Sequence, residues 1–376
     1  MNPIKIAIII GTRPEAIKMA PVYLKMKADS RIEPILIATA QHRQMLDETL
    51  AIFNIKPDVD LDIMQTNQTL SELSARLIVK VQQALAGVKP DVALVHGDTA
   101  TCLFAALAAN YEKIPVGHVE AGLRTYNFNA PWPEEINRRL TDPICKWCFA
   151  PTQRASKNLI EEKIPASHIY ITGNTIIDAL LLSREKIKDK KIPIKGLNLS
   201  NIEGKRLILV TGHRRESFGK PFEQFCFALR DITRAHNDAV IVYPVHLNPN
   251  VQKPVYGILK NEDRIFLIDP IEYLSFVSLM DKCELIITDS GGIQEEAPSL
   301  HKPVLVTRDT TERPEAVESG LAKLVGTSRD NIVLEVNRLL TDSNVYASMA
   351  NGINPYGDGK ASERIVDIIV SDLSSL

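Results

Sequence analysis

The segment TDSGGIQEEAPSL (288–300) has residue types that suit an anion-binding site. It joins an apolar run to a helical pattern through a Ser-Gly-Gly turn at 290–292. Glycines let the backbone approach a ligand closely, and the free N–H groups of a helix start attract negative charge. His213 and Arg313 would complete a diphosphate site through charge-assisted hydrogen bonds. The alternative is a tight turn that uses glycine only for its positive φ angle.

The tetrapeptide R-P-E-A occurs twice, at residues 13–16 and at residues 313–316. Each copy follows an apolar run that ends in a short polar loop. Proline fits the first turn of a helix, where its missing N–H costs nothing, so both copies predict a helix start. Arg13 and Arg313 then lie at helix entrances, and two facing halves would bring both arginines to one cleft. We interpret the repeat as two similar solutions to anion binding rather than as a duplication.

Polar residues follow other apolar runs as well, at the strand ends where open α/β sheets bind their ligands. Asp98 follows DVALVHG, and Glu120 follows IPVGHV. A helix cap or turn explains Asp98 on its own, because caps favour Asp, Ser and Thr. Structural caps do not require arginine and histidine at the same edge, so the whole set favours a ligand site. Its other members are Gly11, Arg13, Glu15, Lys18, Arg124, His213, Arg214, Arg215, Glu216, Ser290, Gly291, Gly292, Glu295, Glu296, Thr310, Thr311, Glu312 and Arg313.

Common cofactor and metal signatures are missing from the sequence. There is no G-x-x-x-x-G-K-[ST] loop, and no G-x-G-x-x-G follows the first apolar run, which argues against a P-loop NTPase and against NAD binding. Cys145 and Cys148 form a C-x-x-C without a second ligand pair or a thioredoxin-like context. We therefore expect reduced, buried thiols, no metal site and no cofactor.

The chain has 376 residues, a net charge of -2 and 45% hydrophobic residues, which is an ordinary globular composition. This charge argues against broad nucleic-acid binding but permits a local basic pocket. The apolar run 6–10 is too short for a signal peptide, and no stretch approaches the ~18 apolar residues of a membrane span. We therefore expect a cytoplasmic protein that does not act at a membrane.

Short β-branched runs alternate with helical patterns along the chain. The runs are continuous rather than alternating, which is typical of parallel strands covered on both faces. Repeated βαβ units predict a doubly wound α/β architecture with two Rossmann-like halves and a boundary near residue 170. The expected strands are 5–11, 34–40, 91–98, 114–122, 148–152, 168–174, 206–213, 239–246, 264–269, 284–289 and 302–308, and the expected helices include 71–87, 101–111, 153–163 and 222–236.

Taken together, these segments resemble the non-hydrolysing UDP-N-acetylglucosamine 2-epimerases. The resemblance implies a GT-B-like fold with an interdomain cleft, a homodimer and no redox cofactor. It implies an N-terminal domain 1–170 for the sugar and the catalytic acids, a UDP-binding domain 171–355, and a C-terminal helix 356–376 that returns to the first domain. The similar segments, in order, are GTRPEAIKMAP (11–21), AQHRQML (40–46), HGDT (96–99), HVEAGLRT (118–125), PEEINRRLTD (133–142), TGNTIIDAL (172–180), TGHRRESFG (211–219), TDSGGIQEEAPSL (288–300), RDTTERPEAV (308–317) and NPYGDGKAS (354–362).

The resemblance also implies roles for individual residues. Asp98, Glu120 and Glu134 match the acids that the family links to catalysis. Ile271 stands where the family often has glutamine, which affects uracil recognition only if that side chain contacts the base. The segment Gln41–Gln44 is similar to one near the family's cleft, and it is either a second nucleotide-sugar site or a surface turn. The residues similar to nucleotide-sugar contacts are Arg13, Lys18, His213, Phe276, Ser290, Gly291, Gly292, Glu296 and Arg313.

The chemistry of such an epimerisation narrows the mechanism. The C2 hydrogen of an N-acetylhexosamine is not α to a carbonyl, so direct deprotonation gives a poorly stabilised carbanion. Transient oxidation needs a nicotinamide site, for which the sequence has no signature. Elimination of UDP to 2-acetamidoglucal and re-addition remains, and the resemblance implies the same route. It demands carboxylates near C2 and stabilisation of the departing diphosphate. Glu134 and Glu135 would point about 100° apart on a helix, so only one of them can easily face the sugar. The alternative is that both acids belong to a structural salt-bridge network with Arg138 and Arg139.

Other functions share parts of this pattern. A GT-B glycosyltransferase would use the same UDP site but needs an acceptor. An epimerase of a modified UDP-acetamido sugar, such as a 2,3-diacetamido uronic acid, would share most motifs, and a hydrolysing relative would release free N-acetylmannosamine. A non-catalytic nucleotide-sugar sensor would tolerate the loss of Asp98 and Glu120. Incubation with UDP-GlcNAc alone separates the epimerase from the glycosyltransferase.

Overall fold

The structure is a computed structural model in which two compact units form the chain. Unit 1 comprises Met1–Leu181 and Tyr356–Leu376, and unit 2 comprises Leu182–Pro355. The described residues are 3–39, 43–65 and 67–374.

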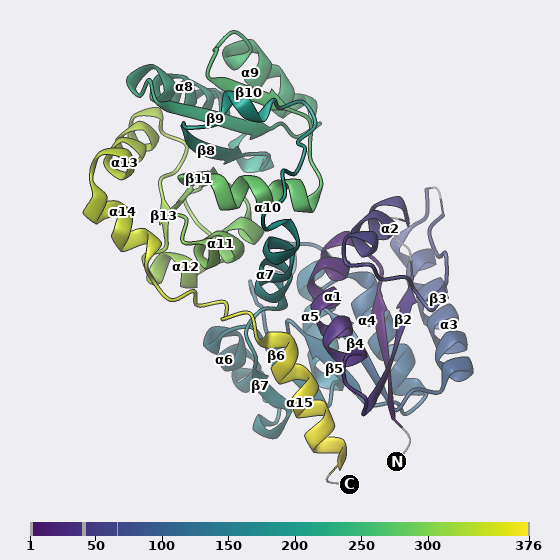
Figure 1. The fold of residues 1–376 in the computed structure, drawn as a ribbon. Coiled ribbons are helices and arrows are strands. Elements are labelled where there is room, and N and C mark those ends of the chain that lie inside the picture. Colours follow the sequence, from purple (N-terminus) through teal and green to yellow (C-terminus); the bar gives the residue numbers. More distant parts are fainter. Residues whose placement is uncertain (1–2, 40–42, 66, 375–376) are drawn as a thin grey trace. The chain divides into compact units, whose positions relative to one another are not determined.

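Unit 1 is built on a parallel sheet with the strand order β3-β2-β1-β4-β5-β6-β7 (Figure 1). The order reverses between β1 and β4, since β2 and β3 lie on one side of β1 and the later strands lie on the other. Open α/β sheets bind ligands at such a switch point, beyond the carboxyl ends of the strands. The strands are β1 (Ile4–Ile10), β2 (Ile32–Ala38), β3 (Val59–Asp60), β4 (Val92–His96), β5 (Val116–Val119), β6 (Trp147–Ala150) and β7 (Ile169–Ile171).

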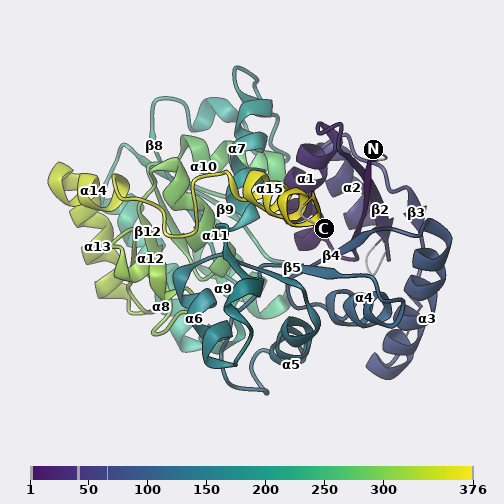
Figure 2. The same cartoon turned by 90° about the horizontal axis from the view of Figure 1, so that it is seen from below.

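Helices cover both faces of the unit 1 sheet. Figure 2 shows α1, α2 and α15 on one face, and α3, α4 and α5 on the other. This coverage explains why β1 is continuously apolar, because its residues Ile6 to Ile10 are all buried. The helices are α1 (Arg13–Lys27), α2 (Arg43–Ile52), α3 (Leu70–Val88), α4 (Ala100–Tyr111), α5 (Glu134–Thr141), α6 (Gln153–Glu161), α7 (Thr175–Ile187) and α15 (Ala361–Ser374).

Unit 2 repeats the parallel arrangement with the strand order β10-β9-β8-β11-β12-β13. Its switch point lies between β8 and β11. The strands are β8 (Arg206–Thr211), β9 (Ala239–Pro244), β10 (Ile265–Ile268), β11 (Leu285–Thr288), β12 (Val304–Val306) and β13 (Ala322–Leu324). The helices are α8 (Lys220–Ala235), α9 (Pro249–Leu259), α10 (Tyr273–Lys282), α11 (Gly291–Glu296), α12 (Pro314–Glu318), α13 (Arg329–Thr341) and α14 (Ser343–Ala350).

The chain crosses from unit 1 to unit 2 within α7, between 181 and 182, and not near residue 170. The first half of α7 belongs to unit 1 because it binds the returning C-terminal segment. The N–H of Asn174 donates to the Tyr356 carbonyl at 2.7 Å, and the Asp178 carboxylate accepts the N–H of Ser362 at 2.8 Å. These bonds lead into α15, which packs on α1 (Figures 1 and 2).

The doubly wound α/β class is confirmed, and each expected strand and helix has a counterpart. Two strands were not expected from the sequence, β3 and β13. They have two and three residues and each contains a charged residue, Asp60 or Lys323, whereas the similarly short β7 and β12 are apolar and were expected.

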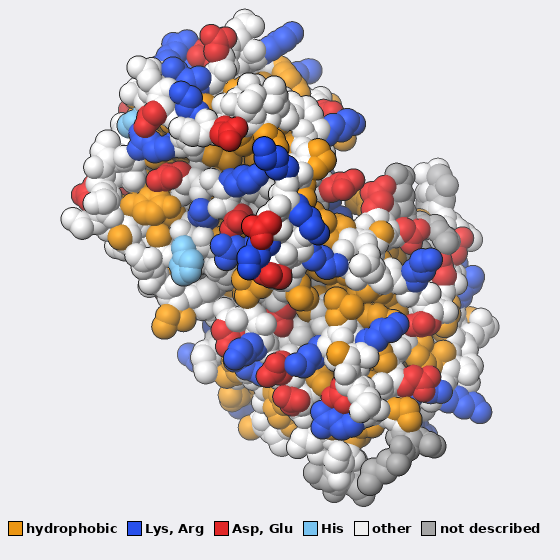
Figure 3. Space-filling model, viewed as in Figure 1, with side chains coloured by type: hydrophobic (Ala, Val, Ile, Leu, Met, Phe, Trp, Pro, Cys, Tyr) orange, Lys and Arg blue, Asp and Glu red, His pale blue; other side chains and the backbone are white. Residues whose placement is uncertain are grey.

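The described surface carries mixed charge. On the face shown in Figure 3, Lys and Arg side chains are interspersed with Asp and Glu. This agrees with the small net charge of -2. None of the described helices is long and apolar enough to cross a membrane.

Candidate active site

Glu15 joins two segments at the switch point of unit 1. Its buried carboxylate accepts the N–H groups of Gly11 and Thr12, at 2.9 and 2.7 Å, just after β1. Its other oxygen accepts the hydroxyl of Thr99 at 2.7 Å, and Thr99 is the N-cap of α4. Burial raises the pKa of Glu15, although these hydrogen bonds oppose the rise. A Cβ at Gly11 would lie 2.4 Å from Thr101 Oγ1, so only glycine fits this close junction.

Both R-P-E-A copies begin helices, as the sequence predicts. Arg13 is the first residue of α1, Arg313 is the N-cap of α12, and each proline lies in the first turn. The Arg13 side chain is exposed. Arg313 is mostly buried, and its Nε donates to Glu295 Oε1 at 2.5 Å. Arg313 is therefore held by an ion pair within its own unit, whereas the Arg13 side chain extends into solvent.

Glu120 directly follows β5 and has a positive φ of 68°. The left-handed region costs a non-glycine residue roughly 1–2 kcal/mol, so the contacts around Glu120 must hold this backbone in place. The carboxylate is mostly buried, forms an ion pair with Lys18, and accepts Asn174 Nδ2 at 2.9 Å. Lys18, which the resemblance relates to the nucleotide sugar, thus lies against a candidate catalytic acid.

His96, the last residue of β4, lies beside this ion pair. Its Nε2 is 3.9 Å from Glu120 Oε2, and burial lowers the pKa of His96 to about 3, so the ring is neutral. Neither ring nitrogen has a hydrogen-bond partner among the described residues. Sequence reasoning missed His96, and its only signal was the position two residues before Asp98.

Asp98 lies in the turn before α4 but does not cap the helix, so of the two alternatives the turn is right and the helix cap is wrong. Thr99 is the cap, and its hydroxyl accepts the N–H of Cys102 at 3.0 Å. The Asp98 carboxylate instead accepts a hydrogen bond from Arg138 Nη2 at 2.5 Å. The backbone carbonyl of Asp98 accepts one from Asn137 Nδ2 at 2.8 Å. With Thr99 as the cap, the Asp98 side chain is available to α5, which carries both partners.

Glu134 and Glu135 begin α5 and have different environments. One oxygen of Glu134 is buried and has no hydrogen-bond partner within the described part of the chain. Glu135 is fully buried and accepts the N–H groups of Thr125 and Tyr126 at 3.0 and 2.9 Å. As helix geometry predicts, only one of the two acids is available to a ligand, and it is Glu134.

The salt-bridge network expected at Arg138 and Arg139 forms in part, because Arg138 contacts Glu135 while the other ion pairs of the two arginines reach acids outside α5. Arg138 contacts Asp98 at 2.5 Å and Glu135 at 3.5 Å. Arg139 contacts Glu162 at 3.3 Å. The network therefore fixes α5 and Asp98 without engaging Glu134.

His213 lies at the switch point of unit 2, where it follows β8. Its N–H and that of Arg214 donate to Asp289 Oδ2, at 2.6 and 2.7 Å, so Asp289 after β11 holds the neighbouring loop. The ring stacks on His246 at 5.2 Å between centroids. Burial lowers the pKa of His213, with His246 and Arg214 adding to the shift and Asp289 opposing it. Sequence reasoning missed the supporting role of Asp289.

The Ser-Gly-Gly turn begins α11. Neither Gly291 nor Gly292 is among the positive-φ residues of the described chain, so the alternative of a glycine-requiring tight turn is wrong. A Cβ at Gly292 would meet only Ser290 Oγ, at 3.9 Å, so the space beside it is open. Ser290 is the N-cap residue, yet its hydroxyl makes no capping bond. These features favour close approach of a ligand to the turn.

The remaining candidates of unit 2 lie around α11. Glu296 at the end of α11 accepts a hydrogen bond from the hydroxyl of Tyr273 in α10 at 2.6 Å, so this bond joins the two helices. Phe276 is a half-buried residue of α10, and Ile271 is half-buried shortly before it. The suggestion of a second site at Gln41–Gln44 begins with residues that lie outside the described part of the chain.

Two groups of candidate residues result. Unit 1 holds Arg13, Lys18, Asp98, Glu120 and Glu134, and unit 2 holds His213, Phe276, Ser290, Gly291, Gly292, Glu296 and Arg313. The first group is rich in carboxylates, and the second combines basic side chains with a helix start. The first suits proton transfer, and the second suits an anion.

Comparison with known sequences identifies the family. The sequence profile for UDP-N-acetylglucosamine 2-epimerase matches residues 24–370. The UDP-N-acetylglucosamine 2-epimerase of Escherichia coli (strain K12) is 54% identical over 375 residues, which cover 99% of this chain and 100% of the relative. That of Yersinia pestis is 54% identical over 367 residues, covering 96% and 97%.

Solved structures agree with the sequence comparison. A putative UDP-N-acetylglucosamine 2-epimerase from Listeria monocytogenes matches with a TM-score of 0.93 and 45% identity, covering 100% of this chain and 98% of that one. The UDP-GlcNAc 2-epimerase from Neisseria meningitidis bound to UDP-GlcNAc matches with a TM-score of 0.86 and 48% identity, covering 98% and 100%. The kitacinnamycin glycotransferase, at 12% identity and a TM-score of 0.66, shares the fold alone. This chain has a GT-B-like fold and belongs to the UDP-N-acetylglucosamine 2-epimerase family.

Proposed function

We propose that this chain interconverts UDP-GlcNAc and UDP-ManNAc by eliminating UDP and adding it back. The observation that carries the proposal is a pair of acids after neighbouring strands at one sheet edge, with a third acid on a helix that is tied to this edge. Asp98 and Glu120 follow the paired strand residues His96 and Val119, and Arg138 ties Asp98 to the helix that begins with Glu134. Carboxylates so grouped suit proton transfer at one carbon of a bound sugar.

In the proposed reaction one carboxylate removes the C2 proton. The C1–O bond breaks, its electrons leave with UDP, and 2-acetamidoglucal remains. UDP then adds back to C1 while a second group protonates C2 from the opposite face. The two faces need two proton-transfer groups, which Asp98, Glu120 and Glu134 supply. Lys18 provides positive charge beside Glu120.

Stabilisation of the departing UDP is assigned to the other group of residues. Arg313 and His213 would donate to the diphosphate, and the open backbone at Gly292 would let it approach α11. The basic residues and the turn surround the switch point of unit 2, where open sheets bind ligands. The relative from Neisseria meningitidis, which is 48% identical, was solved with UDP-GlcNAc bound.

Conversion of UDP-GlcNAc alone tests this function. The purified chain should produce UDP-ManNAc without added NAD, metal or acceptor, as followed by proton NMR of the anomeric signals. An absolute requirement for NAD, or a product that is only free sugar, would contradict it. Conversion of a 2,3-diacetamido uronic acid nucleotide but not of UDP-GlcNAc would transfer the proposal to the modified sugar. The homodimer and the cytoplasmic location stay predictions.

UDP binding should take up a proton at His213. Burial lowers the pKa of this ring, so it is neutral in the free protein at pH 7. A bound diphosphate favours the charged ring, so the contribution of His213 to UDP affinity should grow as pH falls toward the lowered pKa of the free ring and be lost as pH rises. Calorimetry in buffers of different ionisation enthalpy measures the uptake. His213→Asn is the comparison, because protonation of UDP itself is common to both proteins, and equal uptake in both would exclude His213.

A further inference from the structure

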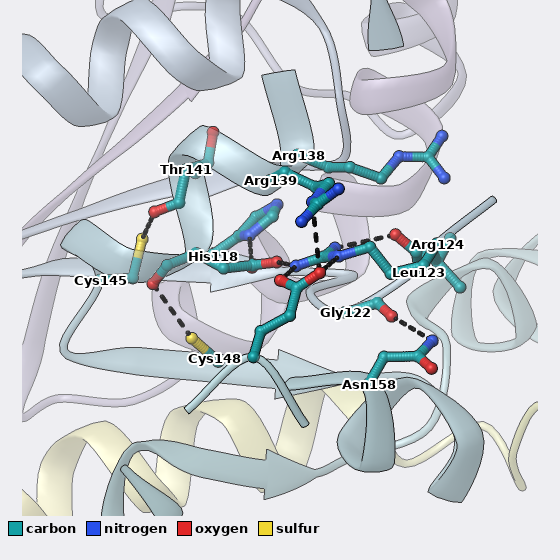
Figure 4. Close-up of polar contacts among 12 residues, drawn as sticks. His118, Gly122, Leu123, Arg124, Arg138, Arg139, Thr141, Cys145, Cys148 and Asn158 are labelled. Atoms are coloured by element: carbon teal, nitrogen blue, oxygen red, sulfur yellow. Dashed lines mark hydrogen bonds and ion pairs between the residues drawn. The ribbon is translucent and has the colours of Figure 1, made fainter. Parts of the chain in front are cut away.

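A buried charged cluster lies beneath the acidic edge of unit 1, and it consists of His118, Arg124, Asp142 and Glu162 (Figure 4). Asp142 is fully buried and bonds two cations at once. Its Oδ1 is 2.6 Å from His118 Nδ1, and its Oδ2 is 2.5 Å from Arg124 Nη2. Arg124 also donates to both oxygens of Glu162, at 2.9 and 2.7 Å. The proposed chemistry uses none of these groups.

The His118 ring faces hydrogen-bond acceptors on both sides. Its Nδ1 faces the Asp142 carboxylate, and its Nε2 lies 2.7 Å from the carbonyl oxygen of Gly97, which can only accept. Cys102 Sγ donates to the same carbonyl at 3.3 Å. Burial opposes a charged ring, yet its surroundings, Asp142 among them, raise the pKa of His118 well above its usual range. His118 is therefore a buried imidazolium that donates from both nitrogens.

Each contact of the cluster leads to a segment that carries a candidate acid. The Gly97 carbonyl directly precedes Asp98 in the chain. His118 and Arg124 flank Glu120, so Asp142 fixes the chain on both sides of the strained residue. Asp142 itself ends α5, the helix that begins with Glu134. One carboxylate thus connects all three acid-bearing segments.

The backbone of this junction is held as well. Cys145 and Cys148, the C-x-x-C pair, are both buried as expected, and their thiols donate to the carbonyls of Thr141 and Asp142 at 3.2 and 3.7 Å (Figure 4). Asn158 donates to the Gly122 carbonyl at 2.9 Å, which restrains the loop after Glu120. These uncharged hydrogen bonds restrain the backbone around Asp142 and Gly122, and they do not replace the negative charge of the Asp142 carboxylate.

We propose that Asp142, through His118 and Arg124, is a positioning residue that sets the relative placement of Asp98, Glu120 and Glu134 for proton transfer. This rests on the proposed function, because it assumes that these acids act on the sugar. Asp142 touches no substrate in this account. Its carboxylate aligns three segments, and misplacement of reacting groups by about 1 Å can cost on the order of 100-fold in rate.

Asp142→Asn keeps the shape of the side chain but removes the charge between two cations. Turnover per folded molecule should fall about 10- to 100-fold, whereas UDP affinity should stay within about two-fold, because the proposed UDP contacts named above belong to unit 2. His118→Gln retains a donor for the Gly97 carbonyl and should lose less turnover. The double variant should be no slower than Asp142→Asn, because the two residues act through one contact.

Val81→Ala is the control for general destabilisation, since Val81 is a buried residue of α3 outside the cluster. It should lower the melting temperature and leave turnover per folded molecule unchanged. Wild-type turnover in Asp142→Asn would overturn the proposal, as would an equal loss of turnover in Val81→Ala. If Asp142→Asn does not fold, His118→Gln decides, and wild-type turnover in that variant would also overturn the proposal.

The charge of His118 is measured separately from activity. In protein labelled with 15N-histidine, both His118 ring nitrogens should show imidazolium shifts at neutral pH, where an ordinary histidine is mostly uncharged, with the signal assigned by its loss in His118→Gln. A neutral ring would exclude the buried charged cluster even if the enzyme is active. Failure of wild-type protein to convert UDP-GlcNAc, with a charged His118, would instead reject the proposed function and with it the positioning role, while the charged cluster itself would stand.

Discussion

Replacement of Glu120 by glutamine should lower turnover by roughly 10²–10⁴-fold, the usual range for a general acid or base. Glutamine keeps the size of the side chain and can still accept from Asn174, but it cannot act as a base, and it removes the negative charge that pairs with Lys18. Affinity for UDP should change far less, because His213 and Arg313 are untouched. Steady-state turnover and UDP calorimetry on the same preparation separate the two effects.

Asp98→Asn is a parallel variant with the same expected loss, because Asp98 binds Arg138 rather than capping a helix. Glu112→Gln is the matched control, since Glu112 only accepts Gln82 Nε2 at the surface of unit 1. Its turnover should equal that of the unmodified chain. Full activity in both Glu120→Gln and Asp98→Asn would remove these acids from catalysis.

Replacement of Arg313 by alanine should weaken UDP binding by roughly 10- to 100-fold. A charged hydrogen bond contributes about 1.5–3 kcal/mol, and each 1.4 kcal/mol is about a factor of ten in affinity. Arg313 already donates to the buried Glu295, so the guanidinium is oriented before the ligand arrives. Calorimetric titration with UDP measures the change, and turnover at saturating sugar nucleotide should fall less than UDP affinity.

Loss of Arg313 also removes an ion pair of the buried Glu295, so Arg313→Lys is needed beside the alanine variant. Lysine retains the charge but not the planar fork, and it should recover part of the affinity. Arg234→Ala is the control, because Arg234 forms a surface ion pair with Glu262 at 2.7 Å. Unchanged UDP affinity in Arg313→Ala and in His213→Ala would mean that the diphosphate binds elsewhere.

The described strands other than β3 and β13 could be predicted because buried parallel strands give continuous apolar runs, whereas the strand order and the switch points came from the structure. The segment Ile6 to Ile10 is such a run, and every residue in it is buried. β13 has only three residues, and its half-buried Lys323 interrupts the apolar pattern, so the sequence carries no signal for it. Because Asp98, Glu120 and His213 directly follow apolar runs, their positions at strand ends could be predicted from the sequence as well.

Side-chain partners are harder to predict, because they depend on tertiary distances rather than on spacing along the chain. Thr99, and not Asp98, caps α4, although both residue types favour that position. Lys18 pairs with Glu120, which is far away in sequence, and Asp142 contacts His118 and Arg124 from the end of another helix. Asp98 and Glu120 are indicated by their places after apolar runs and Glu134 by the resemblance, whereas the charges that hold the first two became visible only in the structure.

The fate of the C2 hydrogen and of the C1–O bond tests elimination most directly. UDP-GlcNAc carrying oxygen-18 in the bridge between C1 and the β-phosphorus is incubated with the chain in deuterated water. The account predicts deuterium at C2 of the product with each turnover, and movement of oxygen-18 into non-bridging β-phosphate positions when the bound diphosphate rotates. Deuterium entry without any C1–O cleavage, with a control showing that the bound diphosphate can rotate, would contradict elimination and indicate a carbanion at C2 instead.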